Sequence, residues 1–164
     1  MPQKDYILGL IEQVGQFLRG ITSLREAGHP DMAVQAVISS IEKLFGLTVE
    51  DLAQLDVDSL FAQLTREESG ANARDKCLAF AALNNQAGLA FAEKDLSALA
   101  QPAFHLALVF SLKALTAFPR AELPSFAPDV PFLRHQLEGF ELPQTTLDLL
   151  AAYERSLPLE VGRA

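Results

Sequence analysis

Apolar side chains recur at alternating steps of three and four residues along the start of the chain, as on one face of an amphipathic helix. The stripe consists of Ile7, Leu10, Val14, Phe17, Ile21 and Leu24, and Ile11 and Leu18 widen it. Gly28 and the following His29-Pro30 stop this helix, because glycine tolerates a left-handed cap and proline cannot continue the old hydrogen-bond ladder. The pattern predicts a long first helix that ends at Gly28.

A second amphipathic helix follows directly, and Gly46 closes it. Its apolar face consists of Val34, Val37, Ile38, Ile41, Leu44 and Phe45. Asp31 can cap or open this helix. Two long helices joined by a tight turn make an antiparallel hairpin, which we expect over residues 1–46.

Residues 47–68 are expected to form a connector of two short helices. Thr48, with Asp51 three residues later, is typical of a capping box, and Asp58 can cap the second short helix. The apolar residues expected to turn inward are Leu52, Leu55, Leu60 and Phe61. The sequence REESG, residues 66–70, predicts the loop that ends the connector.

A second helical hairpin is expected over residues 70–118. Its first helix runs from about residue 71 to 94, Asp95-Leu96-Ser97 turns the chain, and Ser97 can cap the partner helix. Pro119 ends that partner helix, whereas Pro102 falls in its first turn or slightly beyond, where the missing N–H costs little.

Neither helix of this pair has a charged face. No charged residue occurs from Cys77 to Ala92, and none from Leu96 to Leu112. Helices without a charged face are normally surrounded by protein, so we expect this pair to be the buried centre of the molecule. The second run is short for a membrane span and contains Pro102.

Prolines punctuate the rest of the chain, where two helices are expected within residues 124–157. The first runs from about Val130 to Glu138, capped by Asp129 and stopped by Gly139. The second runs from about residue 145 to 157. Its side chains expected in the core are Leu147, Leu150, Ala151 and Leu157. No long alternating strand pattern occurs, so the sequence predicts a single all-α domain over residues 1–164.

Small and aromatic residues recur at fixed intervals across the central turn. Gly88 and Ala100 lie where the two helices must approach closely, Phe91 and Phe104 follow them by three and four residues, and Ala107 continues the close-packed face. A glycine inside a helix costs roughly 1 kcal/mol relative to alanine, so it usually has a packing reason.

This spacing resembles the small–aromatic pattern of a tetratricopeptide repeat. The sequence departs from that pattern at Asn84, where a large residue is usual, and at Pro119, which comes late. The first hairpin echoes the pattern more faintly, in Gly15, Leu18, Ala33, Val37 and Ser40. The resemblance implies a right-handed array of stacked antiparallel helical hairpins.

The first part of the chain also resembles a family of small bacterial proteins with tetratricopeptide-like helices and no assigned function. The resemblance is carried by the opening DYILGLIEQVGQFLRGI, by the segment GHPDMAVQAVISSIEKLFGL and by the central helix pair, and it covers most of residues 5–118. It supports the fold and implies no catalytic residues.

The composition narrows the possible partners. Lys and Arg total 13 and Asp and Glu total 21, which gives a formal charge of −8. This excess argues against nucleic acid and anionic membrane surfaces, which both require basic patches. A single cysteine excludes an intramolecular disulfide, and Asp5 and Glu12 interrupt the N-terminus too early for a signal peptide. We expect a cytoplasmic protein.

Few residues suggest catalysis or metal binding. Arg74 and Lys76 could lower the pKa of Cys77, although a lone cysteine is more often a small core residue. His135 and Glu138 share a helical face at a spacing that two metal ligands could use, but the further carboxylates of a helical di-metal site are not found. Solvated or hydrogen-bonded side chains are the default interpretation for these histidines and for His29 and His105.

The acidic residues of the connector lack a nearby base. This run consists of Glu50, Asp51, Asp56 and Asp58. It could dock a basic partner, but such runs more often cap short helices and face water. No phosphate-binding loop, nucleophile elbow or H-E-x-x-H motif occurs, so we expect no enzyme, no cofactor and no metal.

The sequence therefore favours a non-catalytic module that binds a protein or peptide. By analogy with tetratricopeptide arrays, a groove would be lined by Asn85, Leu89, Ala92 and Glu93, unless the C-terminal helices cover it. Two alternatives stay open. One is a small-molecule-binding or sensory domain whose pocket is lined by Phe80, Phe91, Phe104 and Phe110. The other is a homo-oligomer that uses the stripe of the first helix.

Overall fold

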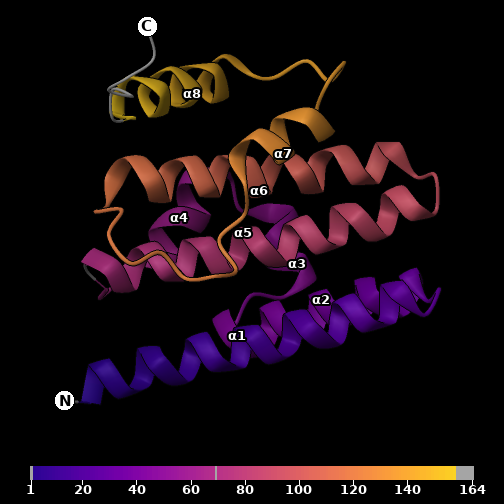
Figure 1. Cartoon of the computed structure of the whole chain (residues 1–164), viewed down its shortest axis with the longest axis horizontal. Helices are drawn as coiled ribbons and strands as arrows, with labels where there is room; N and C mark the ends of the chain where they lie inside the picture. Colours follow the sequence, from indigo (N-terminus) through magenta and orange to yellow (C-terminus); the bar gives the residue numbers. More distant parts are fainter. Residues whose placement is uncertain (1, 69, 158–164) are drawn as a thin grey trace, which may run out of the picture.

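The computed structural model describes residues 2–68 and 70–157, with side chains from Gly9 onward. These residues form eight helices and no strands (Figure 1), which confirms the all-α prediction. The helices are α1 (Pro2–Glu26), α2 (Pro30–Phe45), α3 (Val49–Gln54), α4 (Val57–Thr65), α5 (Gly70–Glu93), α6 (Ser97–Ala117), α7 (Val130–Gln136) and α8 (Gln144–Ser156).

The first two helices bury only part of the stripes that the sequence predicts for them. On α2, Val37 and Ile41 are buried, and the rest of the predicted face is half-buried. On α1, Leu10, Val14 and Ile21 are buried, whereas the side chain of Ile7 lies outside the described residues. Helix α2 ends at Gly46, which has the left-handed φ of 68° and donates its N–H to the carbonyl of Glu42. Residues with a Cβ adopt this conformation reluctantly, so glycine is suited to the position.

Asp31 is not a cap. It lies in the first turn of α2, because the helix already begins at Pro30, and the side chain of His29 at the cap position makes no capping hydrogen bond. A carboxylate in the first turn is still favourable, since it faces the positive end of the helix dipole. It also forms an ion pair with Lys94, just beyond the end of α5.

The connector contains the two predicted short helices. Thr48 and Asp51 form the expected capping box at the start of α3. The cap of α4 is Asp56 and not Asp58, because the carboxylate of Asp56 accepts the backbone N–H of Ser59 at 2.7 Å. Asp58 lies one residue inside the helix, where a side chain can no longer reach that N–H.

The apolar residues of the connector reach the core to different extents. Leu60 is buried, whereas Leu52, Leu55 and Phe61 are half-buried and pack against the edge of the core. Between α4 and α5, residues 66–68 form the predicted loop, and α5 begins at Gly70.

Helices α5 and α6 form the centre of the molecule. Helix α5 packs against α1, α2, α4 and α6, while α7 and α8 pack against α6 (Figure 1). Contacts between Gly88 and Phe104, and between the rings of Phe80 and Phe110, show that α6 runs back along α5. Side chains on every face of α5 are buried over most of its length, as the missing charges predict.

The turn between these helices is closed by backbone groups. The N–H of Leu96 donates to the carbonyl of Phe91, and the carbonyl of Leu96 accepts the N–H of Ala100. Asp95 has a φ of 57°, which turns the chain between the two helices. Ser97 is therefore the first residue of α6 and not its cap, as the sequence had suggested, and Pro102 lies beyond the first turn.

Gly88 lies at a close contact between α5 and α6. A Cβ placed on this residue would lie 2.7 Å from two ring carbons of Phe104, which itself is buried. The packing reason expected for this glycine is present. Ala100 and Ala107 are buried on the same side of α6, whereas Phe91 is half-buried.

Two short helices complete the fold. Asp129 caps α7 as predicted, since its carboxylate accepts the N–H of Phe132. Helix α8 buries Leu150, but Leu147 and Leu157 are exposed and Ala151 is half-buried, so the predicted inner face is partly wrong. The buried side chain one turn before Leu150 is Thr146. Its hydroxyl lies 2.8 Å from Nε2 of His105 on α6, and the pattern of polar and apolar residues does not predict this contact.

Helix α6 has one further property. Within the described residues, it is the only helix long and apolar enough to cross a membrane, and 56% of its most apolar stretch is buried inside the molecule. A core helix enclosed by its neighbours has the same composition, so the apolarity of α6 does not distinguish the two environments.

We predict that Gly88→Ala destabilises the protein, although alanine is the better helix former. Alanine gains roughly 1 kcal/mol of helix propensity, but the displaced Phe104 ring is enclosed and overpacking costs about 1–3 kcal/mol. Gly88→Leu should lower the melting temperature further. The matched control is Gly20→Ala in α1, where a Cβ meets nothing within 4 Å and stability should rise. If urea unfolding gives equal changes in unfolding free energy for Gly88→Ala and Gly20→Ala, the close approach of Phe104 to Gly88 is refuted.

Candidate functional site

The four residues of the expected groove lie in the last turns of α5. Asn85 and Leu89 are half-buried, whereas Ala92 and Glu93 are exposed. Helix α1 borders this surface, because Arg25 donates to the carboxylate of Glu93 at 2.8 Å and to the side-chain oxygen of Gln86 at 2.8 Å. We call the surface formed by Asn85, Leu89, Ala92 and Glu93 the α5 face.

The α5 face has two features that bear on binding. The side-chain oxygen of Asn85 is enclosed and has no hydrogen-bond partner among the described residues. The main contacts of the C-terminal helices α7 and α8 are with α6, on the other side of the central pair (Figure 1). The arrangement leaves the exposed end of the α5 face, at Ala92 and Glu93, open to solvent.

Cys77 is an inert core residue. It is fully buried, and burial raises the pKa of its thiol to about 12, although Lys113 and Lys76 act in the opposite direction. This agrees with the interpretation of Cys77 as a small core residue, because desolvation of the thiolate outweighs the attraction of the nearby cations. Arg74 is turned to other partners, which are described below.

The histidine and acidic motifs form no metal centre in the described part of the chain. His135 and Glu138 contact each other at 3.1 Å, but both side chains are exposed. Among the described residues, no group of three or more His, Cys, Asp or Glu side chains could hold a metal ion.

The acidic residues of the connector have separate local roles and do not form one acidic cluster. Asp51 and Asp56 cap helices, Asp58 pairs with Lys113, and Glu50 is exposed in the first turn of α3. His29 is exposed at the turn before α2. These positions agree with the interpretation of the run as capping and solvated residues.

The four phenylalanines proposed to line a pocket belong mainly to the core. Phe80, Phe104 and Phe110 are buried, and Phe91 is half-buried. Phe80 and Phe110 meet edge to face with 4.7 Å between ring centroids, and the ring of Phe104 lies against Gly88. These rings fill the space between helices.

A cleft of about 670 Å³ lies elsewhere, between the start of α4, the middle of α6 and the start of α8. Its apolar lining comes from Val57, Val109 and Leu149, and its polar lining includes Asp58, His105 and Lys113. We call this space the α4–α6–α8 cleft. No local pattern in the sequence predicts this cleft, because its walls come from segments about 90 residues apart.

His105 forms the link between α6 and α8 beside this cleft. Its Nε2 lies 2.8 Å from the hydroxyl of Thr146, which is buried, and its ring packs near that of Phe140 at 5.8 Å. Burial lowers the pKa of His105 from its usual value of 6.5, because the charged imidazolium loses its hydration. The neutral form is therefore favoured in the folded protein.

Lys113 lies at the α4 side of the cleft. Its ammonium is 3.3 Å from the carboxylate of Asp58 and 4.9 Å from the centre of the Phe61 ring. The lysine stem is mostly covered, whereas the Asp58 side chain is 92% exposed. An ion pair with one fully hydrated partner contributes little to stability, so the charge of Asp58 stays accessible to solvent.

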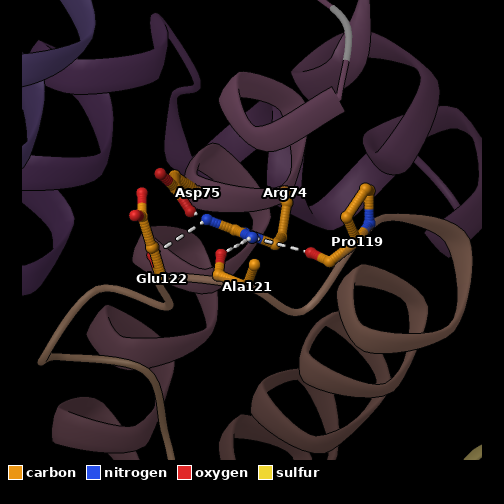
Figure 2. A network of polar contacts seen from close by, with 5 residues as sticks. All are labelled: Arg74, Asp75, Pro119, Ala121 and Glu122. Atoms are coloured by element: carbon orange, nitrogen blue, oxygen red, sulfur yellow. Dashed lines mark hydrogen bonds and ion pairs between the residues drawn. The ribbon is translucent and has the colours of Figure 1, made fainter.

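A buried arginine fixes the segment that follows α6. Arg74 is 2% exposed, pairs with the carboxylate of Asp75 at 2.9 Å, and donates to the carbonyls of Pro119, Ala121 and Glu122 at 2.6, 2.7 and 3.2 Å (Figure 2). The planar guanidinium offers five donors in a fixed fork, which suits several acceptors at once. This network holds the start of the loop to α7 against α5.

The same loop continues to α1. Phe126 packs against a small apolar cluster that consists of Leu10, Val14 and Ala79, and in Figure 1 the segment crosses in front of the central helices. The loop therefore covers the first half of α5, whereas the α5 face lies at the other end of that helix.

Comparison of the chain with protein-family models, curated proteins and solved structures gives no match. Functional assignment rests on the residues and geometry described above.

We predict that Arg74→Met strongly destabilises the fold. The change leaves the Asp75 carboxylate buried without its partner and three carbonyls without a donor, which we expect to cost about 3–5 kcal/mol. Amide hydrogen exchange should accelerate over residues 120–122. The matched control is Arg134→Met, which removes an ion pair whose partners are both more than half exposed and should cost less than about 1 kcal/mol. Similar unfolding free energies for both variants would contradict the role assigned to Arg74.

We predict a pH dependence of stability that arises from His105. Its pKa is lowered in the folded state, so the unfolded chain takes up the proton first and the unfolding free energy falls as pH drops below about 6.5. Above that value the contribution is complete. The groups that face His105 or share its cleft are Thr146, Phe140, Asp56, Asp58, Asp148 and Lys113.

The test is urea unfolding of the parent protein and His105→Gln between about pH 8 and pH 5. Glutamine keeps a hydrogen-bonding group near Thr146 but does not titrate. The stability advantage of the parent over the variant should shrink on acidification. A difference that is constant over this range would show that His105 does not titrate abnormally.

Proposed function

We propose that this protein is a non-catalytic interaction module, built as a tetratricopeptide-like stack of helical hairpins. The proposal is supported by the packing of α5 against both α1 and α2, which is the way the first helix of one repeat lies against the preceding pair. The small–aromatic contact of Gly88 with Phe104 supports the same arrangement within the central pair. The right-handed array and the likeness to the small bacterial family are part of this proposal.

The proposed binding surface is the α5 face. It is supported by the position of α7 and α8 on α6, which leaves Ala92 and Glu93 exposed. Leu89 supplies a partly open apolar contact, and the side-chain N–H₂ of the half-buried Asn85 is the group that would donate to a peptide carbonyl, since its oxygen is enclosed. These groups suit an extended peptide that presents a small apolar side chain. The observation that carries the proposal is this accessible stretch of α5.

The remaining expectations about partners follow the same reasoning. We propose that the partner is a protein, because the net charge of −8 disfavours nucleic acid and anionic membranes. A cytoplasmic location is part of the same proposal. A homo-oligomer formed through the first helix would have to use other side chains than Leu10, Val14 and Ile21, because these are already buried within the chain.

We predict that Ala92→Arg weakens partner binding without unfolding the protein. Ala92 is an exposed alanine near the end of α5, so arginine fits the helix but projects charge and bulk over the α5 face. Tagged parent and variant proteins would be used for capture from native lysate, and each captured partner would then be purified and titrated. We expect the affinity to fall at least about tenfold.

The matched control is Ala62→Arg, which places the same side chain on an exposed position of α4. The control should bind like the parent. A partner that binds Ala92→Arg as tightly as the parent would reject the α5 face, and loss of binding by both variants would reject it as the specific surface.

A further inference from the structure

The α4–α6–α8 cleft has the dimensions of a small-molecule site. Its volume of about 670 Å³ falls within the range of roughly 300–1,000 Å³ that is usual for ligand pockets. Three helices line it. The position is separate from the α5 face, because the cleft opens between α4, α6 and α8 and no residue of α5 lines it.

The apolar lining would receive an uncharged ligand body. Val109 is buried in the middle of α6, and Val57 and Leu149 are half-buried on the flanking helices. Side chains of this kind gain free energy when a hydrocarbon or aromatic group displaces water from them. They do not select the charge of the ligand.

The polar lining is predominantly acidic. Asp56, Asp58 and Asp148 line the cleft and are exposed, and Lys113 is the only lysine or arginine among its lining residues. Lys113 is already paired with Asp58. The three carboxylates exceed the single ammonium by two charges.

Two further lining groups leave this negative charge intact. Asp56 accepts the backbone N–H of Ser59, which lowers the pKa of a carboxyl that is ionised at neutral pH in any case. Burial lowers the pKa of His105, so the imidazole adds no positive charge there. The cleft therefore combines an apolar floor with a negative rim.

We propose that the α4–α6–α8 cleft binds a small organic cation, with a hydrocarbon or aromatic body against Val57, Val109 and Leu149 and an ammonium or guanidinium group at the carboxylates. A ligand that bears a carboxylate or phosphate is disfavoured by the same rim. The binding is independent of the partner surface on α5, so either activity can be lost without the other.

The test uses a pair of probes that differ in charge. The ¹⁵N-labelled full chain is titrated with 2-phenylethylammonium chloride and, separately, with sodium 3-phenylpropionate, each to about 10 mM, since fragments of this size bind in the millimolar range. We expect the ammonium to shift the amide resonances of Val57, Val109 and Leu149 saturably. The carboxylate should leave them unchanged.

Two single-charge variants separate specific binding from attraction to an acidic protein. Asp148→Asn removes a carboxylate from the cleft, and Glu42→Gln removes an exposed one from α2, so both change the net charge equally. The dissociation constant of the ammonium probe should rise roughly threefold to tenfold for Asp148→Asn and stay unchanged for Glu42→Gln. Thr145→Trp, at an exposed lining position, should block the cleft.

Three results would overturn the proposal. The first is equal binding of both probes at the cleft, and the second is no saturable shift of its amides by the ammonium. The third is an equal loss of affinity in Asp148→Asn and Glu42→Gln. The spectrum of each variant without probe shows whether it is folded.

Discussion

At Gly88 the ring of Phe104 lies against the backbone of α5, in space that a single methyl group would fill. The distance between the two central helices is set there, and the other helices pack around that pair. Helices α1 and α2 lie against α5, while α7 and α8 lie against α6. A small change in the separation of α5 and α6 would alter both outer layers, because closely packed interiors transmit such shifts.

Local physical chemistry was sufficient to predict the helices. The helices follow from periodic apolar stripes. Most of their ends follow from the capping box at Thr48 and Asp51 and from glycine and proline stops. The errors at helix caps occur where more than one residue can fill the same role. Asp56 and Asp58 are both able to cap, and only the position of the first helical turn decides between them.

The candidate sites were harder to predict, because they depend on tertiary contacts. Thr146 is polar, so the sequence does not predict it in the core. It is buried because His105 on α6 supplies a hydrogen-bond partner for its hydroxyl. The cleft combines α4, α6 and α8, and a single sequence contains no signal that relates these segments. For Cys77 the neighbours in sequence left activation open beside the favoured interpretation as a core residue, and burial in the folded protein decides for the core residue.

The Arg74 network limits how far this chain behaves as a string of repeats. In a simple repeat array each unit contacts only its neighbours, so units can be removed from one end and the rest stays folded. Here one guanidinium near the start of α5 holds carbonyls 45 to 48 residues later, and Phe126 continues the connection to α1. Ending the chain after α6 would leave that buried arginine without three of its acceptors. The segment that directly follows α6 is thus part of the same unit as the central helices, and the chain cannot be shortened to the end of α6 without breaking this network.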